Sequence, residues 1–271
     1  MAPKPQHHCC SSRNVYASGK PRETISSSLT KFKKNSANSR TTPLIFRVLN
    51  QIWPAHSPDL TYHPQLLQSA GPFVQHLMID SHSAYDCFQT VLSSCPNVRN
   101  LAIYLPTSWG GASMGEVKLN SLLSVLQKMP RLTRLSMSLP RVFCADLLIR
   151  PCLNVTHLEI LLPSAFEYWA NWDVLIQFPK LTHISTEGTI RVHDVLKLLQ
   201  CPRLKLLIVV PPNSDRDRQD LDALCRVEDN RLVLLEAKNH VDVIFDWEKG
   251  ANGGVDTWMF SELVVLARDS E

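Results

Sequence analysis

The sequence predicts an α/β repeat solenoid, in which short parallel strands line one side and helices line the other. Two observations carry this prediction. A nine-residue pattern, clearest at residues 201–209 (Cys-Pro-Arg-Leu-Lys-Leu-Leu-Ile-Val), returns along most of the chain with its aliphatic spacing. Between successive copies, apolar residues recur three and four positions apart, which is typical of one face of a helix. Units of this length cannot bury a core one at a time, so they must stack on their neighbours.

Composition sets limits on the class of protein. The chain has 271 residues, of which 44% are hydrophobic and 20% charged, and this is enough for one repeat array. Its net charge of +3 is unevenly distributed, because residues 1–42 hold eight Lys or Arg against one acid. Residues 43–271 therefore carry about −4. This part offers no broad basic surface of the kind that nucleic acids require.

Residues 1–42 are predicted to be a disordered basic tail, because they are rich in Ser, Lys, Arg and Asn and have few large apolar residues. A solvated tail is the simplest interpretation. The basic stretch at 31–34 would also suit nuclear import or nucleic-acid binding, and the acid-poor start would suit a transit peptide. The adjacent His and Cys residues at 7–10 lack the spaced pairs of a zinc site.

The cysteines favour a reducing compartment. Five of them lie in or at the ends of apolar helical stretches, namely Cys87, Cys95, Cys152, Cys201 and Cys225. Free cysteine behaves as a small core residue in such positions. No apolar run reaches the roughly 18 residues that span a bilayer. We therefore expect an intracellular protein, cytoplasmic or nuclear, with no membrane partner.

Residues 43–70 are predicted to form an N-terminal helical cap. Thr42-Pro43 suits a helix start, and Trp53-Pro54 suits a helix end. The apolar residues between them follow helical spacing: Leu44, Ile45, Val48, Leu49 and Ile52. An open solenoid exposes the apolar face of its first unit, so a cap is needed there.

Residues 71–240 are predicted to hold about seven units. The first aliphatic residues of the units are Val74, Val98, Leu132, Val155, Leu181, Leu204 and Leu232, at separations of 24, 34, 23, 26, 23 and 28. Alternate residues of a strand share a face, so the next aliphatic pair of each unit, such as Leu101 and Ile103, points into the core. Helices are expected at 85–95, 117–129, 145–151, 172–178, 192–201 and 221–227.

Residues 241–271 are predicted to be a C-terminal cap with a terminal helix. The glycines at 250, 253 and 254 indicate a turn rather than a phosphate-binding loop, because no suitable strand and lysine accompany them. An apolar helix is expected to follow at 257–267. Asp256 is its natural N-cap, since a carboxylate there accepts hydrogen bonds from the first free amides.

The repeat resembles that of the leucine-rich repeat family in its irregular form, as in the substrate-receptor part of fungal F-box proteins. The resemblance covers roughly residues 71–237, and the segments 43–54 and 246–258 are similar to parts of the same fungal proteins. It implies a horseshoe with parallel strands on the concave side and helices on the convex side. It also implies a protein partner. The family's Asn or Cys ladder after the strand is absent, and residues 1–42 lack the apolar pattern of an F-box.

Outward-facing strand positions should form rows across the concave surface, with neighbours about 4.8 Å apart. We expect a partner to contact these rows, with two tryptophans as aromatic anchors at the rim. An aliphatic group that includes Leu206 and Ile208 would need cover from the C-terminal segment or from a partner. His157, Glu159 and His183 are weighed as metal ligands and set aside, since histidines on a wet sheet usually bind water. The expected partner-binding residues are His76, Asn100, Tyr104, Arg134, His157, Glu159, His183, Glu187, Trp169 and Trp172.

The sequence has no G-x-x-x-x-G-K and no C-x-x-C. Residues 111–115 (Gly-Ala-Ser-Met-Gly) match the letters of G-x-S-x-G, but the strand pattern ends at Ile103 and not directly before them, as a nucleophile elbow requires. The sequence therefore predicts a non-catalytic scaffold that binds an unidentified protein, with no cofactor, no metal and no small-molecule substrate. Nucleic acid is expected only through the basic tail. One alternative is a degenerate ubiquitin-ligase substrate receptor, with ligase components as partners. Another is an enzyme whose site is grafted on the repeat array.

Overall fold

The computed structural model describes residues 44–49, 68–80, 88–104, 122–138, 152–161, 172–188, 190–211, 218–236 and 240–270. The chain divides into two units, Met1–Thr42 and Pro43–Glu271. All described residues belong to the second unit. The predicted basic tail, the predicted helix at 145–151 and Trp169 lie outside the described residues.

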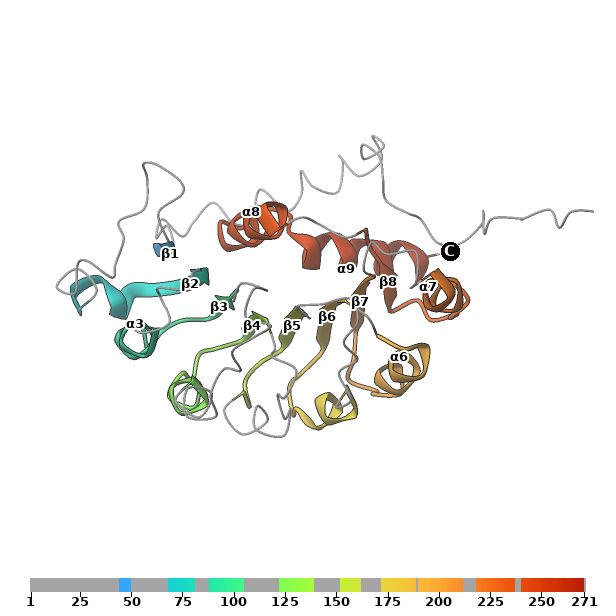
Figure 1. Cartoon of the computed structure of the whole chain (residues 1–271), viewed down its shortest axis with the longest axis horizontal. Helices are drawn as coiled ribbons and strands as arrows, with labels where there is room; N and C mark the ends of the chain where they lie inside the picture. The colour runs from blue at the N-terminus through green and yellow to red at the C-terminus, as the bar shows by residue number, and fades with distance from the viewer. Residues whose placement is uncertain are drawn as a thin grey trace, which may run out of the picture. The chain divides into compact units, whose positions relative to one another are not determined.

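The second unit is built on one parallel sheet whose strands follow chain order, each pairing with the next (Figure 1). Within the described residues the strands are β1 (Leu44–Leu49), β2 (Val74–Asp80), β3 (Asn100–Ile103), β4 (Arg134–Ser138), β5 (His157–Leu161), β6 (His183–Glu187), β7 (Leu206–Val210) and β8 (Leu232–Leu234). This order confirms the predicted α/β class with an all-parallel sheet and is consistent with a solenoid.

The strand register agrees with the predicted rows. One inward row pairs Leu77, Leu101, Leu135, Leu158, Ile184 and Leu207 in succession. All six side chains are buried in one continuous core cluster. The row beside it, which faces away from that core, pairs His76, Asn100, Arg134, His157, His183 and Leu206. The aliphatic period therefore fixed which residues face the core.

Helices cover the core side of the sheet. They are α3 (Phe88–Ser94), a helical segment at 122–126, the 3-10 helix η6 (Trp172–Gln177), α6 (Val192–Leu199) and α7 (Arg218–Leu224). A short 3-10 turn, η3 (Gly71–Phe73), precedes β2. In α6, Val195, Leu198 and Leu199 are buried against the core, as the three-and-four spacing predicts. No helix in the described ranges has the length and apolarity to cross a bilayer.

Trp172 lies in the core, so its predicted place at the rim is wrong. Its side chain is 1% exposed and belongs to the main core cluster. The reason is the tighter helix, because residues three apart share a face in a 3-10 helix. Trp172, Leu175 and Phe178 form such a face and are all buried. The aromatic residue therefore fills the space beneath the sheet.

The N-terminal helical cap is also wrong at 44–49, where the structure has the strand β1. β1 pairs with β2 along its length, with Phe46 opposite Leu77 and Val48 opposite Ile79. An apolar run this short fits a strand or a helix equally well by periodicity. Two β-branched residues and an aromatic one favour the strand. Pairing with β1 also gives hydrogen-bond partners to backbone N–H and C=O groups of β2 that would otherwise be unpaired.

The last unit is offset from the predicted repeat. Leu232 was aligned with Leu204, but in the sheet it pairs with Leu207. The turn before β8 is therefore shorter than its counterparts. Arg231 closes this turn by hydrogen-bonding the carbonyls of Leu199 and Leu204, at 2.6 and 3.2 Å. It also pairs with Asp229 at 2.7 Å.

Two helices follow the sheet: α8 (His240–Ala251) and α9 (Thr257–Arg268). α9 confirms the predicted terminal helix and its N-cap, because the Asp256 side chain accepts a hydrogen bond from the Met259 amide at 2.8 Å. α8 was not predicted. It ends in a Schellman motif, with Gly253 in the left-handed region (φ 75°) and the Gly254 amide bonded to the Lys249 carbonyl at 2.8 Å. The predicted glycine turn is this helix end.

Leu158→Ala tests the shared inward row. Leu158 is fully buried between its neighbours on β4 and β6, so the change should lower the free energy of unfolding by about 2–5 kcal/mol. The measurement is urea unfolding. Leu196→Ala is the matched control, because Leu196 is 46% exposed on α6, and we expect a loss of at most about 0.5 kcal/mol. Equal losses at the two positions would contradict the shared core.

Candidate functional site

The face of the sheet opposite the outer helices, here called the inner face, is covered by α8 and α9 (Figure 1). Two apolar clusters anchor these helices. In the first, Met78, Ala102 and Tyr104 of the sheet pack against Ile244, Trp247 and Ala251 of α8. In the second, Leu206, Ile208 and Val233 pack against Trp258, Val264 and Val265 of α9. The C-terminal segment thus supplies the cover that the exposed aliphatic rows require.

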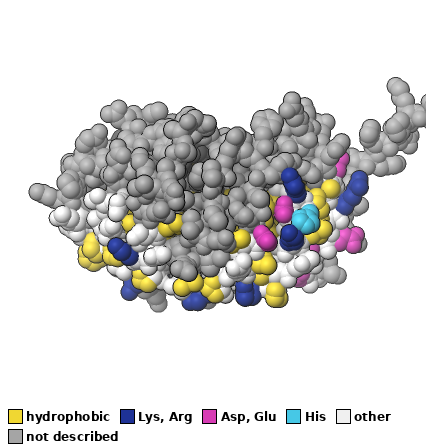
Figure 2. Space-filling view, turned by 60° about the horizontal axis from the view of Figure 1, so that its bottom comes forward, with side chains coloured by type: hydrophobic (Ala, Val, Ile, Leu, Met, Phe, Trp, Pro, Cys, Tyr) yellow, Lys and Arg dark blue, Asp and Glu magenta, His cyan; other side chains and the backbone are white. Residues whose placement is uncertain are grey.

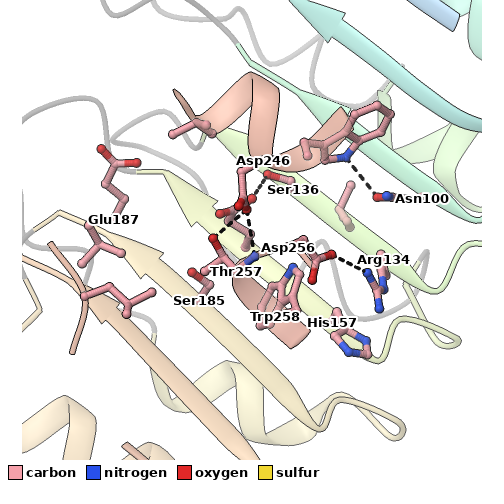
Figure 3. Close-up of a pocket in the computed structure, with 16 residues that line it drawn as sticks. Asn100, Arg134, Ser136, His157, Ser185, Glu187, Asp246, Asp256, Thr257 and Trp258 are labelled. Carbon is pink, nitrogen blue, oxygen red and sulfur yellow. Dashed lines mark hydrogen bonds and ion pairs between the residues drawn. The ribbon is translucent and has the colours of Figure 1, made fainter. Parts of the chain in front are cut away.

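A belt of polar side chains lies between the two apolar clusters (Figure 3). At its α8 end, the Trp247 indole donates a hydrogen bond to Asn100 Oδ1 at 3.1 Å, and both residues are buried. Near its centre, Arg134 of β4 forms a 3.0 Å ion pair with Asp256 at the start of α9. Because buried polar groups are costly when unpaired, these contacts fix where the helices sit as well as holding them.

Asp256 connects the belt to the fold of the C-terminal segment. One of its carboxylate oxygens caps α9 and the other binds Arg134. Nearby, Asp246 of α8 accepts hydrogen bonds from the Thr257 amide at 3.0 Å and the Thr257 hydroxyl at 2.6 Å. Gly250 makes this approach possible, since a Cβ there would stand 2.2 Å from Asp256 Oδ2. Two carboxylates thus hold the N-terminus of α9 and the end of α8 together.

His157 and His183 occupy the same row on adjacent strands and stack face to face, with ring centroids 4.1 Å apart and planes 3° apart. Trp258 of α9 packs edge-on against both rings. Each Nδ1 contacts the hydroxyl of the preceding threonine, Thr156 at 2.8 Å and Thr182 at 2.7 Å. His183 Nε2 lies 3.1 Å from Glu262 Oε1 of α9.

Both histidines are neutral at pH 7. Burial, then the neighbouring His183 and Arg134, lower the pKa of His157 to about 3. Burial, then Lys205 and Arg134, lower the pKa of His183 to about 4. The carboxylate of Glu262 is half exposed to water, so it does not reverse the effect of burial. Burial likewise lowers the pKa of His76, whose Nδ1 has no hydrogen-bond partner.

His157, His183 and Glu262 are close enough to be considered as metal ligands, since their ligand atoms lie within 4.8 Å of one another. The ring geometry does not suit this role. An imidazole binds a metal through a lone pair that lies in the ring plane, and two parallel stacked rings share no such point. Glu159, the carboxylate considered in the sequence, hydrogen-bonds to Ser136 instead. The cluster fits a hydrogen-bonded contact between sheet and helix.

The same residues also form a hydroxyl, imidazole and carboxylate series, from Thr182 through His183 to Glu262. A catalytic triad has this order of groups. Here the threonine hydroxyl also approaches the Thr156 carbonyl at 3.3 Å, and Thr182 does not line the cavity of the inner face. The Thr156–His157 pair repeats the arrangement one strand earlier. The series is therefore a product of the repeat.

A small cavity remains between the polar belt and the helices. It measures about 40 Å³, which accommodates about two or three water molecules. Ser136, Glu159, Asp246 and Thr257 are among the residues that line it. Ser136 hydrogen-bonds to the Glu159 carboxylate and lies 3.1 Å from the Tyr104 hydroxyl. The cavity is thus a hydrated polar seam beneath α8 and α9.

The structure gathers most of the predicted site residues on one face, but beneath its own helices. Those that contact α8 or α9, or line the cavity beneath them, are Asn100, Tyr104, Arg134, His157, Glu159, His183 and Glu187. His76 belongs to the same row. The sequence analysis missed the contributions of Asp246, Trp247, Asp256 and Trp258 to this surface. A signal was available, because Val243, Ile244, Trp247 and Ala251 follow helical spacing.

Comparison with known proteins adds no family, because no protein-family model matches the sequence and no curated protein matches it significantly.

Gly250→Ala tests the junction between α8 and α9. The added methyl group would overlap Asp256, so the carboxylate must move away from Arg134 and from the α9 cap. We expect a loss of roughly 1–3 kcal/mol in the free energy of unfolding, even though alanine is the better helix former. Hydrogen exchange should increase in 240–270 before it increases in β4. Ala267→Gly, an exposed helical control, should leave exchange in α8 unchanged. A more stable Gly250→Ala protein would contradict the contact.

The lowered histidine pKa values predict a pH dependence of stability. In the unfolded chain a histidine has a pKa near 6.5, so between about pH 6.5 and pH 4 the unfolded state binds more protons than the folded state. The free energy of unfolding should therefore fall as pH is lowered from about 7 to 5. Urea unfolding of the double variant His157→Gln, His183→Gln should show a smaller fall. An unchanged pH slope would show that these histidines are not held neutral.

Proposed function

We propose that the chain is a non-catalytic scaffold of the leucine-rich repeat type, whose inner face binds a helical segment of a partner protein. The observation that carries this proposal is that the inner face already binds helices of its own chain. It does so with two apolar patches and a polar belt, the composition found where proteins recognise one another.

The surface offered to a partner has a defined chemistry. Met78, Ala102 and Tyr104 form an apolar patch at one end, and Leu206, Ile208 and Val233 form another at the opposite end. Asn100, Arg134 and His183 between them bind an indole N–H, a carboxylate and a second carboxylate from α8 and α9. An amphipathic helix that carries an aromatic anchor and acidic side chains would make equivalent contacts.

A partner at this face would compete with α8 and α9. One of the contacts that hold the helices is open to water, since Glu262, beside the neutral His183, is 47% exposed. A single hydrogen bond contributes about 1 kcal/mol to stability. Displacement would therefore depend mainly on replacing the two apolar patches and on a new partner for Arg134 and the buried Asp256 carboxylate. α8 and α9 then act as an internal ligand that limits access to the face.

The enzyme alternative finds less support. Among the described residues, the hydroxyls that lie beside a base include those of Thr156, Thr182, Ser136 and Thr257. Each is committed to contacts that the repeat, the belt or the junction of α8 and α9 requires. The cavity of about 40 Å³ suits water better than an organic substrate. The ubiquitin-ligase alternative remains a prediction from resemblance, and no described contact favours it.

Photo-crosslinking tests the proposed face. A photoreactive amino acid at position 134 on the inner face should capture a partner obtained by affinity purification. The same amino acid at position 196 on the exposed side of α6 should not. Partner binding should also increase hydrogen exchange in 240–270, because α8 and α9 are displaced. Capture from position 196 alone, or unchanged exchange in the bound protein, would contradict recognition by the inner face.

A further inference from the structure

One edge of the sheet is made by the turns that lead from each outer helix into the next strand. Each turn has three solvent-facing positions: the proline or its equivalent, the residue after it, and the residue just before the strand. The aliphatic residue between them is buried, as Val98 and Leu204 show. We call this surface, formed by the turns before β2 to β7, the basic edge.

Hydrogen bonds join the turns into continuous rows. One row starts at Gln75, near the start of β2, and continues with the residues just before β3 to β7: Arg99, Thr133, Thr156, Thr182 and Lys205. From Arg99 onward, each backbone amide in this row bonds to the carbonyl of its predecessor at 2.8–3.0 Å. The residues after the prolines are tied as well, with Asn97 bonded to the Pro72 carbonyl at 2.7 Å and Asn154 to the Pro130 carbonyl at 2.9 Å. Side chains that are 20 or more residues apart in sequence are therefore neighbours on this edge.

The charge on this edge has one sign. The three rows contain five cations, Arg99, Arg131, Lys180, Arg203 and Lys205, all exposed, and they contain no acid. The unit that carries them, residues 43–271, has a net charge of about −4. These rows thus hold five of the 20 Lys and Arg residues of a unit that is acidic as a whole. Its effect reaches the sheet, where Lys205 and Arg99 contribute to lowering the pKa of His183 and His76.

Some of these five cations have hydrogen-bond partners within the fold, and others have none among the described residues. The Arg203 guanidinium donates to the Ile176 carbonyl at 2.7 Å, and Lys180 donates to Asn154 Oδ1 at 2.7 Å, so both tie adjacent turns together. Arg99, Arg131 and Lys205 make no hydrogen bond or ion pair through their side chains with any described residue. These three cations are free to bind an external anion.

An apolar row runs beside the cations. Pro96, Pro130, Pro179 and Pro202 are exposed, and Leu153 takes the equivalent place in the β5 turn with 51% exposure. Pro72 starts this row, and Phe73 beside it is 68% exposed. Figure 2 shows dark blue side chains along the described surface with yellow ones among them. The edge therefore combines positive charge with apolar contact surface.

We infer that the basic edge binds an acidic segment of a partner protein that also carries apolar side chains. Carboxylates of the segment would pair with Arg99, Arg131 and Lys205, and its apolar residues would lie on the proline and leucine row. Nucleic acid fits less well, since single strands are held by stacking on aromatic side chains and this row is mainly proline. The inference deepens the proposed function by adding a second contact for a protein partner, outside the inner face.

Fluorescence anisotropy with synthetic probes tests this surface on the full chain. The main probe is a labelled peptide of Glu-Glu-Leu repeats, compared with peptides of Glu alone, of Lys-Lys-Leu repeats, and with oligodeoxythymidine of equal length. We expect the Glu-Glu-Leu peptide to bind most tightly, the Glu peptide more weakly and the Lys-Lys-Leu peptide not at all. Binding should weaken as salt is raised, because exposed charges are screened.

Charge reversal tests whether the cations of the basic edge bind the acidic peptide. Arg131→Glu with Lys205→Glu should lower the affinity of the protein for the Glu-Glu-Leu peptide by about tenfold or more. Arg191→Glu with Lys249→Glu is the matched control, because both residues are exposed, lie outside the turns that lead into the strands and give the same change in net charge. Arg131→Gln with Lys205→Gln serves if the reversed variant does not fold, and should weaken binding by a smaller factor.

Three results would overturn the inference: no binding of the Glu-Glu-Leu peptide, equal weakening in the control variant, or tighter binding of the oligonucleotide. A photoreactive residue at position 131 separates the inference from the proposed function. Partner capture at 134 without capture at 131 keeps the inner face and removes the edge. Capture at 131 without capture at 134 keeps the edge and removes the inner face.

Discussion

The parallel pairing of successive strands in a constant register is the constraint on which the rest of the structure depends. A single strand of four or five residues leaves its backbone groups unpaired, and a neighbour on each side satisfies them. Constant register places Leu101, Leu135 and Leu158 directly beside one another, so their side chains form one core. A slip of one residue would turn that row to the other face. The same register aligns the polar row and the turns of the edge.

The C-terminal helices follow from what this register leaves on the inner face. Aliphatic side chains at both ends of the sheet need cover, and α8 and α9 provide it. The polar belt between the ends decides where the helices lie, because Asn100 and Arg134 each receive one matching group. Apolar contact alone would tolerate sliding, whereas a buried hydrogen bond does not. The inner face is thus covered by two helices of the same chain.

The two surfaces differ in how their side chains are committed. On the inner face, polar groups are paired with α8 and α9, so an outside partner must replace existing contacts. On the basic edge, the side chains of Arg99, Arg131 and Lys205 are exposed, so the proposed binding there would replace no contact with a described residue. Electrostatic attraction at an open edge speeds encounter, while buried contacts decide dissociation. A partner that used both surfaces would meet the edge first and the inner face second.

The sequence by itself determined the strand rows and core residues of the units before β8, because these follow from local spacing repeated many times. It also determined the Asp256 cap, because a carboxylate just before a helix accepts hydrogen bonds from its first free amides. It could not decide that residues 44–49 form a strand, since a six-residue segment with five apolar residues fits either period and only pairing with β2 selects one. It also placed Trp172 at the rim, where a 3-10 helix in fact turns the indole inward. The sequence indicated that the aliphatic end of the inner face needs cover from the C-terminal segment or a partner, but where the covering helices lie was beyond its reach. Spacing shows that α8 has an apolar side, but only the folded sheet, with Asn100 and Arg134 at fixed places, decides where that side docks.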